Sequence, residues 1–290
     1  MTFARYYNPT AEITIVGNRV NFADGLGLNV KCTIERSFES EPDRCSVAIE
    51  GLDPVRARLM GQIFRELPDS PVNTMTVAIG YDAIAVPAFT GRLESFTDST
   101  QVGPETWTYA TAGDGADAYD TDKIVPAGAA QVPVAAQVRG AIAVLGLVEG
   151  PSVTPVINSV DPAAQGPFNQ SGARTAADLL DNACRTLRCR WYIRDGMVHL
   201  VRQGLPDPSA RAVVIAPQQP GPRFPGAPLV EPVTFGGGGI MKCATFLDPG
   251  IVPGGQVSYQ GGMFRVEHVV HSFETRGAAP WVSRIVGRSL

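Results

Sequence analysis

The stretch 241–288 reads MKCATFLDPGIVPGGQVSYQGGMFRVEHVVHSFETRGAAPWVSRIVGR, and Pro and Gly divide it into short segments in which apolar and polar residues alternate. Alternation with a period of two residues is typical of strands that bury one face. Together with the residues just before it, the stretch predicts strands at 229–235, 240–247, 256–259, 263–273 and 281–286. We therefore expect a β unit over 229–290.

The same alternation recurs in the first 112 residues, where it predicts strands at 11–16, 30–38, 44–50, 73–81, 83–96 and 106–112. One helix interrupts them. Asp53-Pro54 supplies an N-cap followed by Pro at the first helical position, and Pro68 ends the helix. We expect an apolar face on this helix, formed by Leu59, Ile63 and Phe64. Residues 1–112 are thus predicted to form an antiparallel β unit with one helix.

Residues 113–203 differ in composition and are predicted to form a small α/β insert. The segments 133–147 and 174–189 are helix candidates, and Asp195-Gly196 between two apolar runs predicts a hairpin. The second helix has an apolar stripe of Leu179, Leu180, Ala183, Cys184 and Leu187. The segment 204–228 contains seven prolines and is predicted to be a Pro/Gly-rich excursion with little core of its own.

The composition is that of a globular, turn-rich protein, with 44% hydrophobic and 18% charged residues and with 31 Gly and 24 Pro among 290. The net charge of −4 divides into −5 for 1–105, −1 for 106–205 and +2 for 206–290. Nucleic-acid binders usually have a basic excess, so specific nucleic-acid binding is not expected. No apolar run approaches the roughly 18 residues that span a bilayer, and MTFARYYNPTAEI has no apolar signal core. We expect neither membrane insertion nor a secretory signal.

The cysteines are odd in number and form no CxxC motif; they are Cys32, Cys45, Cys184, Cys189 and Cys243. With no signal peptide expected, this pattern predicts reduced, buried thiols. Cys184 and Cys189 are five residues apart, which on a helix turns them about 140° away from each other. A disulfide between them is therefore not expected.

No catalytic or cofactor-binding motif is present, since GxSxG, Walker, HExxH and GxGxxG patterns are all missing from the sequence. His268 and His271 have HxxH spacing, but residues three apart on a strand face opposite sides, so a structural or surface role is favoured over a metal site. A pH-sensitive interface is the other interpretation, and His199 is treated in the same way. The glycines 236–239 precede no helix and predict a bent interstrand loop.

Charged side chains form an acidic group and a basic group in the sequence, and neither matches a specific functional motif. Carboxylates lie near predicted strand ends in both β units, at Glu94, Asp98, Glu105, Glu267 and Glu274. A glycosidase needs such a pair, but 28 acidic residues make proximity by chance expected. A basic group, Arg185, Arg188, Arg190 and Arg194, complements the dipole of the second insert helix. An interface for an acidic partner or for nucleic acid is the alternative, because Trp191 and Tyr192 adjoin it. We predict no catalytic, metal or cofactor-binding residues.

The stretch 241–288 resembles the C-terminal part of phage tail baseplate hub proteins of the late control protein D group. The shared elements are the turn Leu247-Asp248-Pro249, Pro253-Gly254, Gly261-Gly262, a long strand ending in His271 and a last strand opened by Trp281. The first β unit is similar to the first barrel of these hubs through RSFESEPDRCSVAIEGLDPVRARLM and VAIGYDAIAVPAFTGRLES. The helix and hairpin at 174–202 are similar to the small domain between the barrels, whereas 113–172 matches weakly.

The resemblance implies a mainly β (α+β) fold of two tail-tube-like antiparallel β-barrels, 1–112 and 229–290, with the insert and the excursion between them. It implies a structural, non-enzymatic baseplate hub of the virion, made and assembled in the host cytoplasm. Three subunits are expected to form a homotrimeric ring that joins the hexameric tail tube to the trimeric tail spike protein of a contractile tail for DNA ejection. The tail tube protein is thus a partner, and the tape measure and baseplate wedge proteins are further candidates.

Two other classes of function stay open from the sequence alone. One is a cell-wall-degrading or carbohydrate-binding tail component, which a peptidoglycan release assay distinguishes from a hub. The other is a cytosolic β enzyme, which is expected to be active as a monomer. An acidic subunit gives only weak attraction to DNA, so we expect an acidic or neutral inner wall along which DNA slides.

Overall fold

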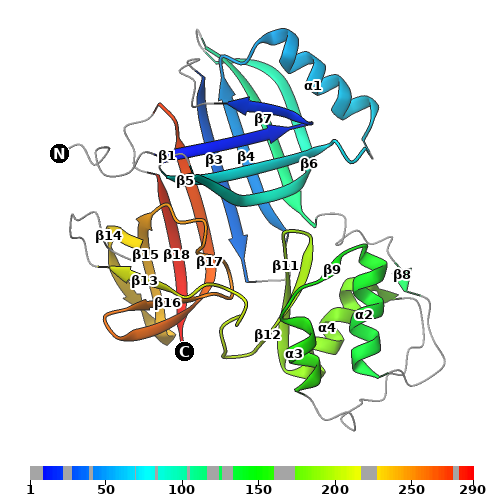
Figure 1. Cartoon of the computed structure of the whole chain (residues 1–290), viewed down its shortest axis with the longest axis vertical. Helices are drawn as coiled ribbons and strands as arrows, with labels where there is room; N and C mark the ends of the chain where they lie inside the picture. The colour runs from blue at the N-terminus through cyan, green and yellow to red at the C-terminus, as the bar shows by residue number, and fades with distance from the viewer. Residues whose placement is uncertain are drawn as a thin grey trace.

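A computed structural model describes residues 9–21, 28–38, 42–68, 70–81, 84–102, 105–115, 124–125, 133–159, 174–216, 227–276 and 281–290. The molecule is elongated, with a first β unit at one end and an α/β insert and a second β unit side by side at the other (Figure 1). Most of the strands belong to one sheet of 13 strands. Within the described residues, no helix is long and apolar enough to span a membrane.

The first β unit is an antiparallel arrangement in the order β3-β4-β7-β6-β5-β1-β2. Its strands are β1 (Pro9–Ile15), β2 (Asn18–Asn21), β3 (Asn29–Ser37), β4 (Asp43–Glu50), β5 (Thr74–Tyr81), β6 (Ile84–Val102) and β7 (Glu105–Asp114). Burial alternates along β3 and β4, as the sequence predicts, because one face of each strand packs in the core. Ile13, Ile34, Val47 and Met75 belong to that core.

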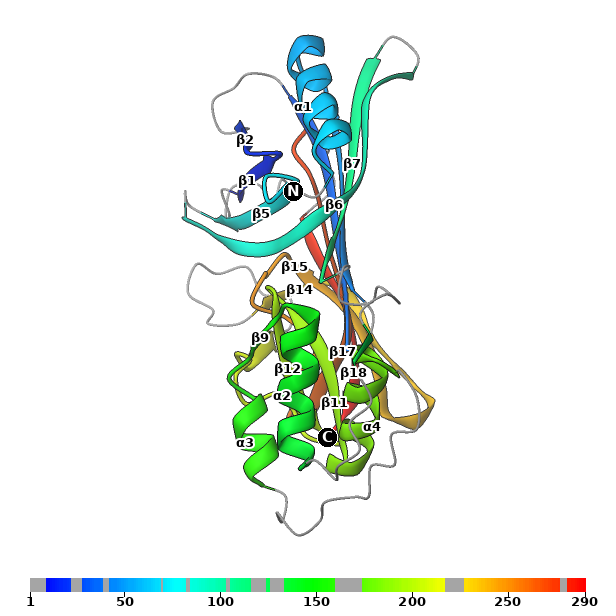
Figure 2. The ribbon, with the colours of Figure 1, turned by 90° about the vertical axis from the view of Figure 1, so that its right-hand side faces the viewer.

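Helix α1 (Pro54–Glu66) begins as predicted, because the Asp53 carboxylate accepts the Val55 N–H at 3.0 Å. Figure 2 shows the helix beside the β6–β7 hairpin at one end of the molecule. The predicted face was wrong at Leu59, which is 51% exposed, whereas Ala57, Met60 and Gly61 are buried. The helix sits close to β6, since a Cβ on Gly61 would lie 3.1 Å from Asp98, and this contact favours small residues over Leu.

The described residues of the insert form three helices and a small sheet. Its helices are α2 (Val134–Leu145), α3 (Val153–Asn158) and α4 (Ala176–Leu187). Its sheet has the order β11-β12-β9, formed by Cys189–Arg194, Met197–Arg202 and Val148–Glu149, and a second small sheet pairs β8 (Ile124–Val125) with β10 (Arg174–Thr175). The two predicted helices and the Asp195-Gly196 hairpin are confirmed. Helix α3 was not predicted, because it is only six residues long and contains Pro155.

The second β unit contains β13 (Val213–Ala216), β14 (Ala227–Gly236), β15 (Ile240–Phe246), β16 (Gln256–Tyr259), β17 (Gly262–Glu274) and β18 (Val282–Ser289). Their pairings run β16-β13-β14-β15-β18-β17 and return to β16. The glycines 237–239 form a 3-10 turn between β14 and β15. Strand β13 lies within the predicted excursion 204–228, because Val213 and Ile215 alternate into the core. Residues 217–226 of that excursion lie outside the described residues.

Strand β17 joins the two β units. Its first four residues pair with β16, and from His268 to Glu274 it pairs with β3, from Ser37 to Lys31. A register shift between Val266 and His268 separates the two parts. We call the β17–β3 pairing the seam. The mainly β, largely antiparallel fold is confirmed. The two units share one sheet through the seam, and their closure into two barrels stays a prediction. Strand β17 has 13 residues and is therefore long enough to pair with strands of both β units.

Candidate functional site

The three units meet at a buried cluster that we call the junction. Phe38, at the end of β3, is fully buried and packs against Tyr192 of the insert, with ring centroids 5.4 Å apart. The guanidinium of Arg265, from the second β unit, lies 4.7 Å from the centre of the Phe38 ring. The Asp207 N–H donates to the Gly254 carbonyl at 2.7 Å. Side chains and backbone from all three units therefore fix one another here.

Asp207 is the best-bonded acid of the junction. Tyr192 Oη donates to its Oδ2 at 2.5 Å, and the Ser209 N–H and hydroxyl donate to its Oδ1 at 2.8 and 2.7 Å. Burial alone would raise the pKa of Asp207, but hydrogen bonds from His199, Tyr192 and Ser209 outweigh it and hold that pKa well below its usual range. An ionised Asp207 thus stabilises the loop that leaves β12.

Ser152, His199 and Asp207 come together in a way that the sequence did not predict. His199 Nδ1 lies 3.4 Å from Ser152 Oγ and 3.5 Å from Asp207 Oδ2, and its ring stacks on Tyr192 at 5.1 Å. A catalytic triad needs the Ser and the Asp on different ring nitrogens. Here both lie at Nδ1, all three side chains are at most 2% exposed, and Ser152 Oγ accepts the Leu200 N–H. The arrangement is suited to holding the insert together.

A second acidic group lies where the hairpin β11–β12 contacts the first β unit. Arg36 Nε lies 3.3 Å from Asp43 Oδ2, and Arg36 Nη2 lies 3.6 Å from Asp195 Oδ1. The Asp114 carboxylate accepts the N–H groups of Asp195 and Gly196 at 2.6 and 3.1 Å. Burial raises the pKa of Asp43 to about 7 and that of Asp114 to about 6.

The buried charges Arg36 and Asp43 were not predicted, although the sequence contains a signal for them. In VKCTIERSF, Arg36 falls in phase with Cys32 and Ile34, whose side chains point into the core. Asp43 is in phase with Cys45 in the same way. A charged residue on the inward phase of a strand requires a buried partner, and that requirement predicts an ionic contact.

The histidines of the HxxH pair lie in different surroundings. His271 is buried on β17, with Nδ1 2.8 Å from Ser283 Oγ and Nε2 3.1 Å from the Ile251 carbonyl. Burial lowers the pKa of His271 to about 3, with Arg36 acting in the same direction. His268 is partly exposed, with Nε2 3.0 Å from Glu35 Oε1. The described residues contain no group of three or more His, Cys, Asp or Glu that could hold a metal ion.

The carboxylates considered for acid–base chemistry do not converge in the described part of the chain. Asp98 pairs with Arg65 at 3.3 Å, and Glu105 accepts the Trp107 indole N–H at 3.2 Å. Glu267 pairs with Arg265 at 2.6 Å, Glu274 lies 3.4 Å from Lys31, and Glu94 is exposed. Asp98, Glu105, Glu267 and Glu274 each contact a different side chain, as carboxylates in structural ion pairs and hydrogen bonds do.

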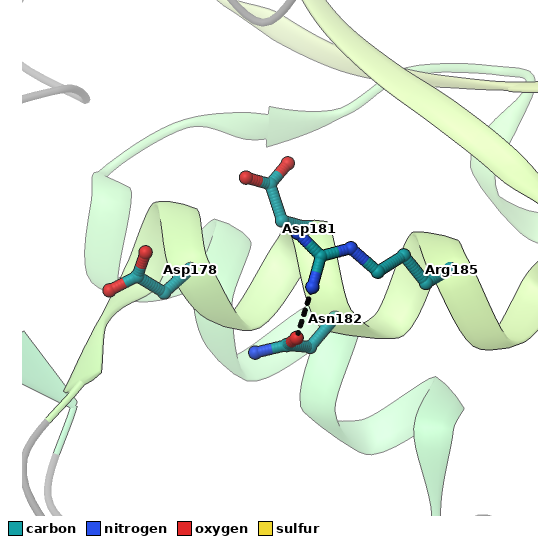
Figure 3. A pocket seen from close by; sticks show the side chains of 4 residues that line it. All are labelled: Asp178, Asp181, Asn182 and Arg185. Atoms are coloured by element: carbon teal, nitrogen blue, oxygen red, sulfur yellow. Dashed lines mark hydrogen bonds between the residues drawn. The ribbon is translucent and has the colours of Figure 1, made fainter.

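The basic group of the insert is divided by the fold. Arg185, Arg188 and Arg190 are exposed, whereas Arg194 reaches into the junction, 5.9 Å from the centre of the Tyr192 ring. Trp191 and Tyr192 are both buried. A shallow polar depression on α4 is lined by Asp178, Asp181, Asn182 and Arg185 (Figure 3). Asp178 caps α4 and Asp181 accepts the Trp191 indole N–H at 2.7 Å, so both acids already serve the fold.

All five cysteines are free and buried, as predicted. The expectation that Cys184 and Cys189 point apart was wrong, because α4 ends at Leu187 and Cys189 begins β11. The two thiols are hydrogen-bonded, and this bond together with burial raises the pKa of Cys184 far above its usual value. Cys32 and Cys45 lie 3.9 Å apart between β3 and β4. Buried thiols of raised pKa are poor nucleophiles.

The outward face of the large sheet continues across the seam, and we call it the polar sheet face. Paired residues of successive strands form a ladder of hydroxyls across β6, β7, β4, β3 and β17: Ser95, Thr111, Ser46, Thr33 and Ser272. Ser95 Oγ and Thr111 Oγ1 lie 2.7 Å apart. Two polar contacts cross the seam on this face: Lys31 Nζ lies 3.4 Å from Glu274 Oε1, and His268 Nε2 lies 3.0 Å from Glu35 Oε1. By register, the exposed side chains of Arg44 and Lys242 lie on the same face, so it carries charges of both signs among its hydroxyls.

Comparisons with known proteins place this fold. No family model matches the sequence, and no curated protein matches it. The 43 kDa tail protein of prophage MuSo2 from Shewanella oneidensis aligns with 97% of this chain and 98% of its own, with a TM-score of 0.58 and 10% identity. The tail protein from Neisseria meningitidis MC58 aligns over 97% of both chains, with a TM-score of 0.60 and 10% identity. The chain has the fold of phage tail proteins, in agreement with its resemblance to the hub group.

Proposed function

We propose that the chain is a structural baseplate hub of a phage tail, whose three copies form a ring between a hexameric tail tube and a trimeric spike. The observation that carries the proposal is the polar sheet face, which runs unbroken from the first β unit to the second through the seam. Two β units in each of three subunits supply six similar elements, the number that a hexameric tube requires. The likeness to two tail proteins over 97% of the chain supports the same class of function.

The polar sheet face has the properties that a DNA channel needs. Hydroxyl side chains hydrate well, and acidic groups such as Glu274, which pairs with Lys31, weaken the attraction of this face for phosphates. We therefore place this face on the inner wall of the ring. DNA then slides past it instead of binding, and the subunit makes no specific contact with nucleic acid.

The remaining strand edges fit a subunit that closes a ring. Strand β14 is paired with β13 only at its first residues, and Pro232 and Glu231 occupy the open part of its edge. Prolines and charges on an edge prevent uncontrolled strand addition. A closed ring of subunits covers the rest of this open strand edge. Because the ring closes, subunits do not continue to add and form a fibre. The proposal includes assembly into a homotrimer, contacts with the tail tube and the spike, a location in the virion, and a contractile tail.

The proposed role is not enzymatic. Asp98, Glu105, Glu267 and Glu274 are engaged with nearby Arg, Lys and Trp groups, and the Ser152, His199 and Asp207 set is closed to solvent. The competing role is a cell-wall-degrading or carbohydrate-binding tail component. Incubation of the purified chain with peptidoglycan tests it, and we expect no release of soluble fragments. Release that disappears in Glu94→Ala, Glu267→Ala or His271→Ala would overturn the structural assignment.

The ring itself is tested by light scattering and negative-stain imaging of the chain alone and with its tail spike protein. We expect a trimer, formed either by the chain alone or on addition of the spike. A second measurement is a DNA titration at low salt, for which we expect no submicromolar binding. Submicromolar affinity that weakens steeply with salt would show phosphates neutralised by Arg or Lys and would contradict a sliding surface.

A further inference from the structure

The contact between the insert and the first β unit contains more acidic than basic groups. Arg36 on β3, Asp43 on β4 and Asp114 on β7 are each 3% exposed. Asp195, in the turn of the hairpin β11–β12, lies 3.6 Å from Arg36 at the rim, with its side chain 47% exposed. One buried guanidinium therefore faces two buried carboxylates and a third that is half in water. The buried group is neutral only when the two buried acids together hold one proton.

The surrounding elements do not supply the missing positive charge. On β11, Tyr192 interacts with Asp43 and donates its proton to Asp207. Arg194 is directed to Asp207, with Nη2 3.9 Å from Oδ2 of that residue. On β17, His271 is held by Ser283 and Ile251, and Arg36 disfavours its protonated form. Among the described residues packed against the buried group, none supplies that charge, so a proton on the acidic pair neutralises it.

The same contact is what docks the insert. Asp114 accepts two N–H groups of the hairpin turn, from Asp195 and Gly196. Gly115 has a φ of +68°, and a Cβ there would lie 2.7 Å from the Ile193 side chain, so the strand end and the hairpin are in close contact. Any separation of the hairpin from β7 breaks both hydrogen bonds and hydrates Asp43 and Asp114.

We propose that Asp43 and Asp114 form a proton-dependent latch, which holds the insert against the first β unit when the pair carries a proton and loosens when both acids are ionised. Asp114 serves as the acceptor for the hairpin turn, and its hydrogen bonds favour the carboxylate form. Asp43 accepts only the weaker Ser37 N–H contact, at 3.4 Å, and is the group that holds the proton. When Asp43 is ionised, the buried group carries an excess of negative charge. Separation of the hairpin from the first β unit hydrates this charge and thereby stabilises it.

The size of the effect follows from the two protonation equilibria. With Asp43 titrating at about 7 in the docked form and at about 3.8 once hydrated, opening becomes about tenfold more frequent between pH 6 and pH 8. The sign is that of a raised carboxyl pKa, since the docked form binds the proton more tightly and is favoured as the pH falls. The amides of Asp195 and Gly196 report opening directly, because docking gives them their acceptor.

The test is hydrogen exchange of the full chain at pH 6 and pH 8, corrected for the intrinsic pH dependence of exchange and read at Asp195 and Gly196. We expect protection about tenfold lower at pH 8. Asp43→Asn cannot ionise and is expected to keep the pH 6 protection at pH 8. The matched control, Asp98→Asn, removes a carboxylate paired with Arg65 on α1, away from the junction, and is expected to keep the wild-type response.

Gly115→Ala supplies the loosened reference, since it crowds Ile193 without a change of charge, and we expect low protection at both pH values. Circular dichroism shows whether each variant is folded. If Asp43→Asn does not fold, the pH response of the wild type against Gly115→Ala still decides. Equal protection of the wild type at pH 6 and pH 8, or a full tenfold response in a folded Asp43→Asn, would overturn the latch.

Discussion

Phe38→Ala is expected to weaken all three units at once, because Phe38 belongs to the first β unit and contacts both of the others. It is fully buried, packs on Tyr192 of the insert and lies under Arg265 of the second β unit. Replacing a buried Phe by Ala leaves a cavity and costs about 3–5 kcal/mol. We expect a loss of about 4 kcal/mol in the free energy of unfolding, with the Arg265 contact included.

The chain has three tryptophans that report on different places. Trp107 lies in β7 and Trp191 in β11, whereas Trp281 precedes β18 and packs against the core of the first β unit, with its ring centroid 4.5 Å from that of Phe273. Urea unfolding of variants that keep a single Trp, each compared with its own parent, follows the insert through Trp191, the first β unit through Trp107, and the contact between the last strands and the first unit through Trp281. We expect Phe38→Ala to shift all three midpoints together, because the junction and the seam couple the units.

The matched control is Phe235→Ala, which removes the same side chain from a position that is 62% exposed. We expect it to cost about 1 kcal/mol or less. A shift confined to the Trp191 reporter would show that the insert unfolds independently. A loss below about 1 kcal/mol for Phe38→Ala would refute the role of the junction altogether.

Other predictions concern pH, assembly and charge. The pKa of His271 is about 3 in the folded chain and about 6.5 in the unfolded one, so the free energy of unfolding of the wild type falls as the pH drops below about 6.5, by up to about 1.4 kcal/mol per pH unit. Urea midpoints measured at pH 7, 5.5 and 4.5 are expected to fall less in His271→Gln. Deletion of 217–226 with a short Gly/Ser link is expected to leave the monomer folded, since β13 and β14 remain paired, and to abolish ring assembly in light scattering; an unfolded monomer or an intact ring would contradict this. Glu35→Lys with Glu274→Lys turns the polar sheet face basic, and a titration is expected to show salt-sensitive DNA binding absent from the wild type; unchanged binding would argue against this face as the channel wall.

Local signals in the sequence predicted most of the elements. Asp53 before Pro54 fixed the start of α1, and Asp195-Gly196 fixed the hairpin of the insert. Alternation located the long strands, because a half-buried strand has a pattern that neighbouring residues reveal. Strand β13 was missed because four residues are too few for the pattern to stand out among prolines.

The contacts between distant segments could not be predicted in the same way. The seam pairs His271 with Ile34, residues that are 237 positions apart, and nothing local specifies such a partner. The contact between Cys184 and Cys189 depended on where α4 ends, and boundaries are the least certain part of a helix prediction. Arg36 and Asp43 are recognisable in the sequence as charges on the inward-facing side of their strands. No local pattern, however, predicts that the hairpin β11–β12 contacts them.

The most direct test of the central claim is electron cryo-microscopy of the chain assembled with its tail spike protein. We predict a ring of three copies with the polar sheet face, and the ladder from Ser95 to Ser272, lining a central channel. A chain that stays monomeric in the presence of the spike, or a ring in which this face points outward to solvent, would contradict it.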